Sequence, residues 1–252
     1  MKAIILAAGV GSRIRPLTDN CPKCLLKVCG NTILEMMISH IQNCGINEII
    51  FVTGYLEDQI KKYAKKRFPD IKAYFVTNEK YTETNTGFSL LLAKNFVRNS
   101  DFIKFDADVV FNKEVLKKLI ACLYENVLCI DKNIHLDAED IKVIINGTNK
   151  ILKVSKTIDP KKAIGESIGI EKIGKNTAEL LFKELEIMMK DKKNHQKYYE
   201  AAYERLLEKG TSFHALDITG LDWVEIDTQE DFELVKNKLR MAKLQLISSS
   251  TV

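Results

Sequence analysis

The first half of the chain alternates short apolar runs with longer amphipathic stretches. Runs of strand length occupy residues 3–6, 48–53, 71–76 and 102–105, and helical patterns occupy residues 32–44 and 57–67. This alternation is typical of right-handed βαβ units, whose helices cover both faces of a parallel sheet. We therefore expect an α/β fold with a Rossmann-like, mixed but mainly parallel sheet, helices on both faces, and ligands at the carboxyl ends of the strands.

The middle of the chain changes pattern. Short extended runs at residues 127–130, 140–145 and 150–155 are joined by turns, and Asn146-Gly147 predicts a hairpin. We expect a strand next, at 165–170, and then helices at 177–190 and 198–209. Extended segments are expected last, at 214–218 and 223–226. We expect one domain over residues 1–240, with a small mixed β extension for an acceptor embedded at about 127–220, and a helix end and tail at 241–252.

The first apolar run leads into a loop of small residues. Such residues let main-chain N–H groups surround an anion, and Arg13, Arg15 and Lys23 add fixed cations to the same segment. The Walker pattern is absent, and Ile14 stands where the dinucleotide fingerprint needs a third glycine. A tight turn without a ligand is the alternative, but it explains the clustered basic residues less well.

The segment LAAGVGSRIRPLTDNCPK, residues 6–23, resembles the signature of the nucleoside-triphosphate transferase family. All of the fixed positions of that signature are filled here. The resemblance implies transfer of a nucleotide to a phosphorylated small molecule, with Arg13 and Lys23 as catalytic residues that balance the charge of the triphosphate. It also implies a nucleotide site made of Leu6, Ala8, Gly9, Gly11, Ser12, Arg13, Lys23, Thr53, Gly54, Asn85, Thr86, Ser89 and Asp106.

Two acidic groups have the residue types of a metal site. Asp106 and Asp108 follow the fourth predicted strand and are expected to project the same way, where a divalent ion such as Mg²⁺ relieves their repulsion. The resemblance adds Asp227, with Glu225, to Asp108 as metal ligands. The alternatives are a solvated acidic turn at residues 106–108 and a helix N-terminal carboxylate at Asp227.

The acceptor-binding residues are inferred from the resemblance. Lys156 matches a family lysine that contacts the acceptor phosphate, Glu166 lies on the strand near which relatives hold the acceptor, and Asp217 and Trp223 are further contacts. Solvated surface charge is the alternative for Lys156. Tyr198, Tyr199 and Tyr203 would form an aromatic wall for a quaternary ammonium group, but their spacing does not put all three on one helix face, which favours packing.

Composition narrows the function classes. The chain has 252 residues, 46% hydrophobic content and a net charge of only +4, too low for a dense nucleic-acid-binding face. Its N-terminus has no signal-peptide pattern and no apolar run is long enough to cross a bilayer, so we expect a cytoplasmic protein without membrane partners. The six cysteines lack a second metal-binding pair, which favours reduced thiols over a zinc site.

The stretch Asn85-Thr86-x-x-Ser89 resembles that of relatives acting on phosphocholine or aminoalkylphosphonates, although it also fits ordinary helix capping. We therefore predict a Mg²⁺-dependent cytidylyltransferase that uses CTP and a small phosphorylated or phosphonate acceptor of the phosphocholine or 2-aminoethylphosphonate type. Sugar-1-phosphate or inositol-1-phosphate acceptors are the first alternative, and a non-catalytic nucleotide-binding subunit is the second. An oligomer is compatible with the sequence.

Overall fold

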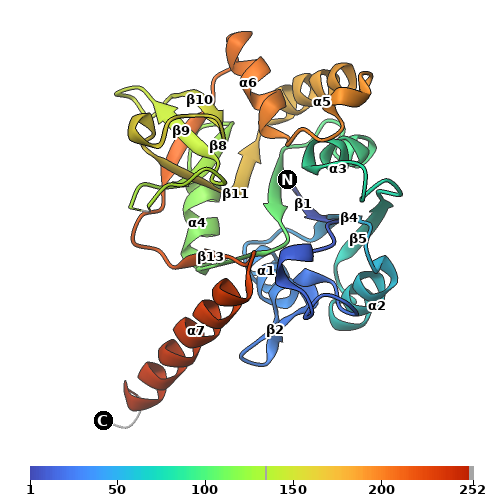
Figure 1. Ribbon diagram of the computed structural model, residues 1–252, viewed down its shortest axis with the longest axis vertical. Helices are drawn as coiled ribbons and strands as arrows, with labels where there is room; N and C mark the ends of the chain where they lie inside the picture. Colours follow the sequence, from blue (N-terminus) through green and yellow to red (C-terminus); the bar gives the residue numbers. More distant parts are fainter. Residues whose placement is uncertain (134, 250–252) are drawn as a thin grey trace.

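The computed structural model describes residues 1–133 and 135–249 and contains a nine-stranded mixed sheet (Figure 1). Four parallel strands form one side of this sheet, in the order β5 (Lys72–Thr77), β4 (Glu48–Thr53), β1 (Lys2–Ala7) and β6 (Phe102–Asp106). The other side is built on β11 (Gly165–Ile173), antiparallel to β6, and continues through β9 (Lys142–Ile145) and β10 (Ile151–Ser155), while β8 (Val127–Asp131) pairs with β11 and β12 (His214–Asp217). The expected mixed α/β fold is confirmed.

The side chains of β1 show how the sheet separates two cores. Ala3 and Ile5 face one core and Ile4 and Leu6 the other, because successive side chains of a strand point to opposite faces. The first core is covered by α1 (Ile33–Asn43), α2 (Glu57–Arg67) and α4 (Lys113–Ala121), and the second by α3 (Thr86–Leu92), α5 (Lys175–Met189) and α6 (Glu200–Glu208). Both faces are therefore closed by helices, and the strand ends are left for function.

A third apolar cluster ties the end of the chain to its beginning. In this cluster Ile226, Phe232 and Val235 are buried together with Ile14. Two short antiparallel strand pairs lie beside it: β2 (Lys27–Val28) with β3 (Asn31–Thr32), and β7 (Val109–Phe111) with β13 (Trp223–Glu225). The helix α7 (Gln229–Ser249) begins in this cluster and then extends away from the body (Figure 1). This packing brings the segment just before α7 next to the N-terminal loop.

Thr228 directly precedes the first residue of α7. Its Oγ1 accepts a hydrogen bond from the Asp231 backbone N–H at 3.2 Å, and the Asp231 carboxylate accepts one from the Thr228 N–H at 2.8 Å. This reciprocal pairing satisfies main-chain donors that a helix start leaves open. Residues 250–252 of the predicted tail lie outside the described residues.

The hairpin prediction at Asn146-Gly147 is confirmed, and two short segments show detail beyond the sequence pattern. The segment after the N-terminal loop forms a 3-10 turn, Lys23–Leu25, followed by the two-residue strand β2. The hairpin expected at Asn146-Gly147 joins β9 and β10, but its left-handed residue is Asn149, and the Asn146 side chain accepts hydrogen bonds from the N–H groups of Thr148 and Lys150. None of the helices within the described part of the chain has the length and apolar character needed to cross a membrane.

Candidate active site

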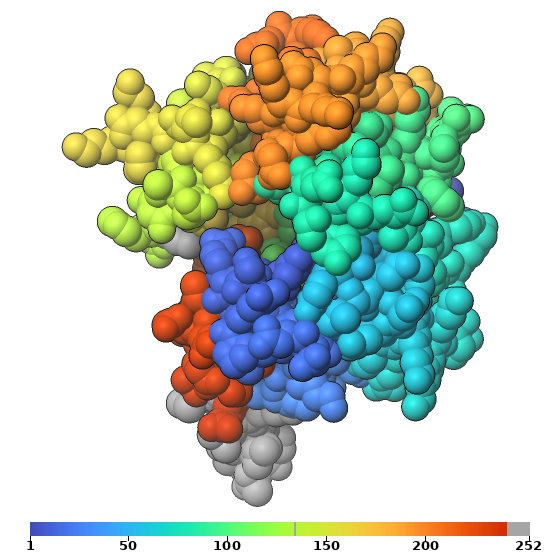
Figure 2. Space-filling view, turned by 45° about the vertical axis from the view of Figure 1, so that its right-hand side comes forward, coloured from blue at the N-terminus to red at the C-terminus, as the bar shows by residue number. Residues whose placement is uncertain are grey.

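A cavity of about 480 Å³ opens at the carboxyl ends of β1 and β6. Figure 2 shows the surface hollowed between the N-terminal segment in blue, the region of α3 in green and the later segments in yellow and orange. Most of the predicted site residues line this cavity: Leu6, Ala8, Gly9, Gly11, Ser12, Arg13, Lys23, Asn85, Thr86, Ser89, Asp106, Asp108, Lys156, Glu166, Glu225 and Asp227. Segments that are far apart in the sequence therefore share one site.

The loop after β1 is held in shape by its own neighbours. Gly11 has φ of 65°, a left-handed conformation that glycine adopts without strain, and its carbonyl accepts a hydrogen bond from the buried Thr18 hydroxyl at 2.8 Å. The Ala8 carbonyl accepts a further bond, from the Tyr55 N–H at 3.1 Å. Because these contacts lie away from the cavity, small residues such as Gly9 are left to form its wall.

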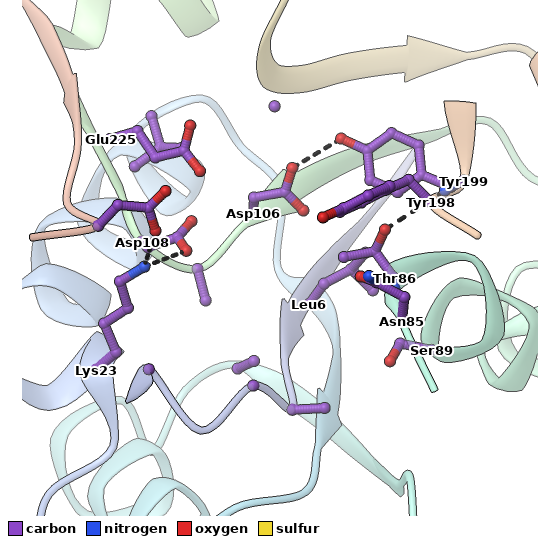
Figure 3. Close-up of a pocket in the computed structure, with 18 of the residues that line it drawn as sticks. Leu6, Lys23, Asn85, Thr86, Ser89, Asp106, Asp108, Tyr198, Tyr199 and Glu225 are labelled. Carbon is purple, nitrogen blue, oxygen red and sulfur yellow. Dashed lines mark hydrogen bonds and ion pairs between the residues drawn. The ribbon is translucent and has the colours of Figure 1, made fainter. Parts of the chain in front are cut away.

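The two basic residues of the loop pair with acids from distant strands. The Lys23 ammonium lies 2.8 Å from Asp108 Oδ2 and 2.6 Å from Asp227 Oδ1, and Arg13 Nη2 lies 2.6 Å from Asp227 Oδ2. Figure 3 shows the Lys23 ammonium between two carboxylates, with Glu225 beside them. Burial lowers the pKa of Lys23, but the attraction of Asp108 and Asp227 outweighs this effect and raises it overall.

The carboxylates around Lys23 fit a divalent cation. Oxygen atoms of Asp108, Glu225 and Asp227 lie within 4.8 Å of one another, and Asp108 Oδ1 is buried without a hydrogen-bond partner. Although Glu225 as a whole residue is exposed, desolvation of its carboxyl group and repulsion by Asp108 and Asp227 raise its pKa to about 9. A hard cation with oxygen ligands would relieve this repulsion, so the residues present suit Mg²⁺.

The expectation that Asp106 and Asp108 project together was wrong. Asp106 is the last residue of β6, and its Oδ2 accepts hydrogen bonds from Lys104 Nζ at 2.8 Å and Tyr199 Oη at 2.7 Å. Asp108 lies in the turn beyond the strand, where the two-residue alternation no longer applies, and it pairs with Lys23. Figure 3 accordingly shows Asp106 between the Lys23 cluster and the two tyrosines.

The segment from Asn85 to Ser89 combines capping with a place on the cavity wall. Asn85 Oδ1 accepts a hydrogen bond from the Thr86 N–H at 2.8 Å at the start of α3. Asn78 Nδ2 holds the Thr84 hydroxyl at 2.9 Å and the Ser89 hydroxyl at 3.0 Å. The capping alternative is therefore observed for Asn85, and its role toward a nucleotide stays a prediction.

The predicted acceptor residues divide into two pairs. Lys156 and Glu166 line the cavity; the Lys156 ammonium is 3.2 Å from the Glu139 carboxylate, and Glu166 is 95% buried without an ion pair in the described structure. Burial, together with repulsion by Asp140, Asp137 and Asp131, raises the pKa of Glu166 to about 8.

Asp217 and Trp223 lie outside the cavity lining. Asp217 forms an ion pair with Lys132 at 3.0 Å, and Trp223 Nε1 donates a hydrogen bond to Asp131 Oδ2 at 2.8 Å.

Two predicted nucleotide residues also lie outside the lining. Thr53 donates a hydrogen bond to Glu57 Oε2 at 2.9 Å, and a Cβ on Gly54 would meet Tyr81 Cβ at 2.8 Å and the Ala8 carbonyl at 2.9 Å. Gly54 therefore supports the loop after β1 from behind by allowing the close approach of two segments.

Sequence reasoning missed a buried polar group behind Asp106. Lys104 is fully buried and lies 2.8 Å from Glu171 Oε2, and it also contacts the Tyr199 hydroxyl. Glu200 at the start of α6 is 5% exposed and lines the cavity. The one signal in the sequence was a lysine inside the apolar run at 102–105, which predicts a partner in the core.

Comparisons with known proteins agree with this arrangement. Residues 2–126 match the family described as Nucleotidyl transferase. The chain is 32% identical, over 93% of its length and 98% of the relative's, to CTP:phosphoglutamine cytidylyltransferase of Campylobacter jejuni, and 41% identical to choline-phosphate cytidylyltransferase of Streptococcus pneumoniae over 46% of this chain and 48% of that protein. The solved structure of CTP:phosphocholine cytidylyltransferase from Streptococcus pneumoniae superposes with a TM-score of 0.78 at 25% identity, covering 94% of this chain and 98% of the other.

Proposed function

The chain belongs to the nucleotidyl transferase family, and we propose that it transfers CMP from CTP to a small phosphorylated or phosphonate acceptor. One oxygen of the acceptor's phosphate or phosphonate attacks the α-phosphorus of CTP in line, the bond to the β-phosphate oxygen breaks, and pyrophosphate leaves. An acceptor phosphate is already ionised near neutral pH, so the step needs no side-chain base. The choice of CTP is supported by the two relatives named for cytidylyl transfer.

The observation that carries the proposal is the group of charges next to the small-residue loop. Lys23 and Arg13 are within 2.8 Å of the carboxylates of Asp108 and Asp227, and all four residues line one cavity. Fixed cations at such a place stabilise charge that develops on a triphosphate in the transition state. When Lys23 and Arg13 bind phosphate oxygens, Asp108 and Asp227 become available to another cation.

Mg²⁺ is the proposed cofactor, with Asp108, Glu225 and Asp227 as the residues that would hold it. When bound, it would neutralise phosphate charge and orient the triphosphate. The loop of Ala8, Gly9 and Gly11 would supply main-chain donors, and Lys156 at the far side would contact the acceptor's phosphate. We further propose a cytoplasmic location.

Pyrophosphate release tests this proposal. Purified protein with Mg²⁺ is given CTP, UTP, GTP or ATP, each with phosphocholine, 2-aminoethylphosphonate, inositol 1-phosphate or glucose 1-phosphate. We expect release from CTP with at least one of the first two acceptors and little with the other nucleotides. A preference for sugar or inositol phosphates would favour that alternative acceptor class, and no release from any pair would contradict nucleotidyl transfer.

A further inference from the structure

The cavity contains a second acidic group, separate from the carboxylates around Lys23. Asp106 and Glu200 line the cavity, and Glu171 lies behind them. Within the described residues, the only cation in ion-pair contact with these three carboxyl groups is Lys104, whose Nζ is 2.8 Å from both Asp106 Oδ2 and Glu171 Oε2. Lys104 thus pairs with Asp106 and Glu171, while the carboxyl group of Glu200 is buried outside ion-pair distance of it.

Two oxygen atoms of this group have no hydrogen-bond partner among the described residues. Asp106 Oδ1 and Glu200 Oε2 are both buried and accept no hydrogen bond from the described residues. Burial, with repulsion from Asp106, raises the pKa of Glu200 to about 7 and that of Glu171 to about 8, despite the attraction of Lys104. Leaving buried acceptors unpaired is costly, and charge-assisted donors are the strongest partners for them.

The position of Asp106 is fixed by its surroundings. Tyr199 Oη and Lys104 Nζ hold its Oδ2, and Gly169 packs against it where the pairing of β11 with β8 is interrupted. A Cβ on Gly169 would lie 2.5 Å from Asp106 Oδ2. Both donors thus go to Oδ2, and Oδ1 is the oxygen of Asp106 that is left without a donor among the described residues.

The nearby aromatic rings already face cations of the protein. Lys156 Nζ lies 4.6 Å from the centroid of the Tyr198 ring, and Lys104 Nζ lies 3.7 Å from that of the Tyr199 ring. Tyr203 is fully buried and is outside the cavity lining. A quaternary ammonium group binds mainly through aromatic faces and has no N–H to donate, so this site suits it poorly.

We propose that Asp106 and Glu200 bind a primary ammonium group on the acceptor, and that the cavity prefers such acceptors to those with a quaternary ammonium group. This inference rests on the proposed function, since it assigns the end of the acceptor remote from the reacting phosphate. A primary ammonium group offers three N–H donors and one positive charge. It would donate hydrogen bonds to both unpartnered oxygens and place a cation beside Glu200.

A series of acceptors that differ only in N-methylation tests the preference. Phosphoethanolamine, its mono- and dimethyl derivatives and phosphocholine are compared by kcat/KM for pyrophosphate release from CTP. We expect a decrease with each methyl group, reaching about 100-fold or more for phosphocholine, because a site built to accept hydrogen bonds rejects ligands without the donor. Equal or better use of phosphocholine would overturn the proposal.

Substitution of Glu200 separates this contact from general packing. We expect Glu200→Gln to raise KM for phosphoethanolamine about 10- to 100-fold and to flatten the methylation series, with a small effect on KM for CTP. Glu204→Gln is the matched control, because it makes the same change one turn further along α6, outside the cavity lining. If Glu200→Gln weakens all acceptors equally, including glycerol phosphate, which has no amino group, the residue is structural and the assignment is wrong.

Acceptor binding is also measured directly by calorimetry with the wild-type protein and a non-hydrolysable CTP analogue. Tighter binding of phosphoethanolamine than of phosphocholine supports the inference, and the reverse order contradicts it. This measurement does not depend on turnover. A lack of pyrophosphate release would therefore count against the proposed function, while the order of acceptor affinities is judged separately.

Discussion

Carboxyl groups at the two ends of the cavity are stabilised in opposite ways. Near the N-terminal loop, Asp108 and Asp227 form short ion pairs with Lys23, and Arg13 adds another contact to Asp227. Near α6, Glu200 is buried with no ion-pair partner among the described residues. At the first end, here called the paired end, Lys23 and Arg13 can exchange their carboxylate partners for the oxygens of a polyanion. At the second end, here called the unpaired end, Glu200 has no cation beside it in the described part of the chain, and a ligand can supply one. One cavity is thus prepared for opposite charges at its two ends.

The largest expected effect is a loss of turnover when Lys23 is removed from the paired end. Lys23→Ala removes the ammonium that bridges Asp108 and Asp227, and one lost charge contact of this kind costs about 100- to 1000-fold in turnover. Pyrophosphate release measures the loss. Lys27→Ala, at an exposed lysine of β2, is the control and should keep wild-type turnover. A Lys23 variant that changes only nucleotide affinity would instead indicate a binding subunit.

The next largest effect is a loss of stability at the unpaired end, where Gly169 packs against Asp106. Gly169→Ala places a Cβ 2.5 Å from Asp106 Oδ2 at a residue with φ of 74°. We expect a loss of unfolding free energy of about 1–2 kcal/mol from the backbone and about 1–3 kcal/mol from overpacking, together with reduced kcat/KM.

Gly210→Ala is its control, because Gly210 has φ of 89° but open space around the added Cβ. It should show the backbone cost alone in thermal unfolding. Equal destabilisation by the two substitutions would mean that contact with Asp106 adds nothing.

A smaller effect appears in the pH dependence of stability. The pKa of Glu166 is about 8 in the folded chain against an ordinary value of 4.5, so between these values the folded state holds more protons than the unfolded state. The stability from the protonated group is present below pH 4.5 and is lost as the pH rises to 8. In Glu166→Gln, Tm should fall less across this window than in the wild type, whereas the exposed Glu179→Gln should leave the profile unchanged. Parallel profiles for all three proteins would contradict this assignment.

The smallest expected effect concerns Asp217, which lies outside the cavity lining. Its exposed ion pair with Lys132 at 3.0 Å should contribute about 0–1 kcal/mol. We therefore expect Asp217→Asn to change kcat/KM less than twofold in steady-state assays. A large rise in the acceptor KM would restore Asp217 as an acceptor contact and extend the unpaired end toward β12.

The paired end was predictable from the sequence to a greater extent than the unpaired end. The strand at 48–53 and the helix at 57–67 agree with the structure because their patterns are local. The loop signature indicated Lys23, the acids after the fourth strand indicated Asp108, and the family resemblance indicated Asp227. The group around Lys104 depends on β6, β11 and α6 meeting, which no local pattern specifies. Asp106 and Asp108 were expected to act together because a strand alternation was extended two residues past the strand's end.

The pairing of β13 with β7 determines when Asp227 can reach its partners in the N-terminal loop during folding. Asp227 follows β13, and its bond to Arg13 joins positions 214 residues apart. Contacts of such long sequence separation form late, because loop closure must precede them. During synthesis the loop after β1 leaves the ribosome long before Asp227, so the ion pairs of Arg13 and Lys23 with Asp227 can form only after residue 227 has been added.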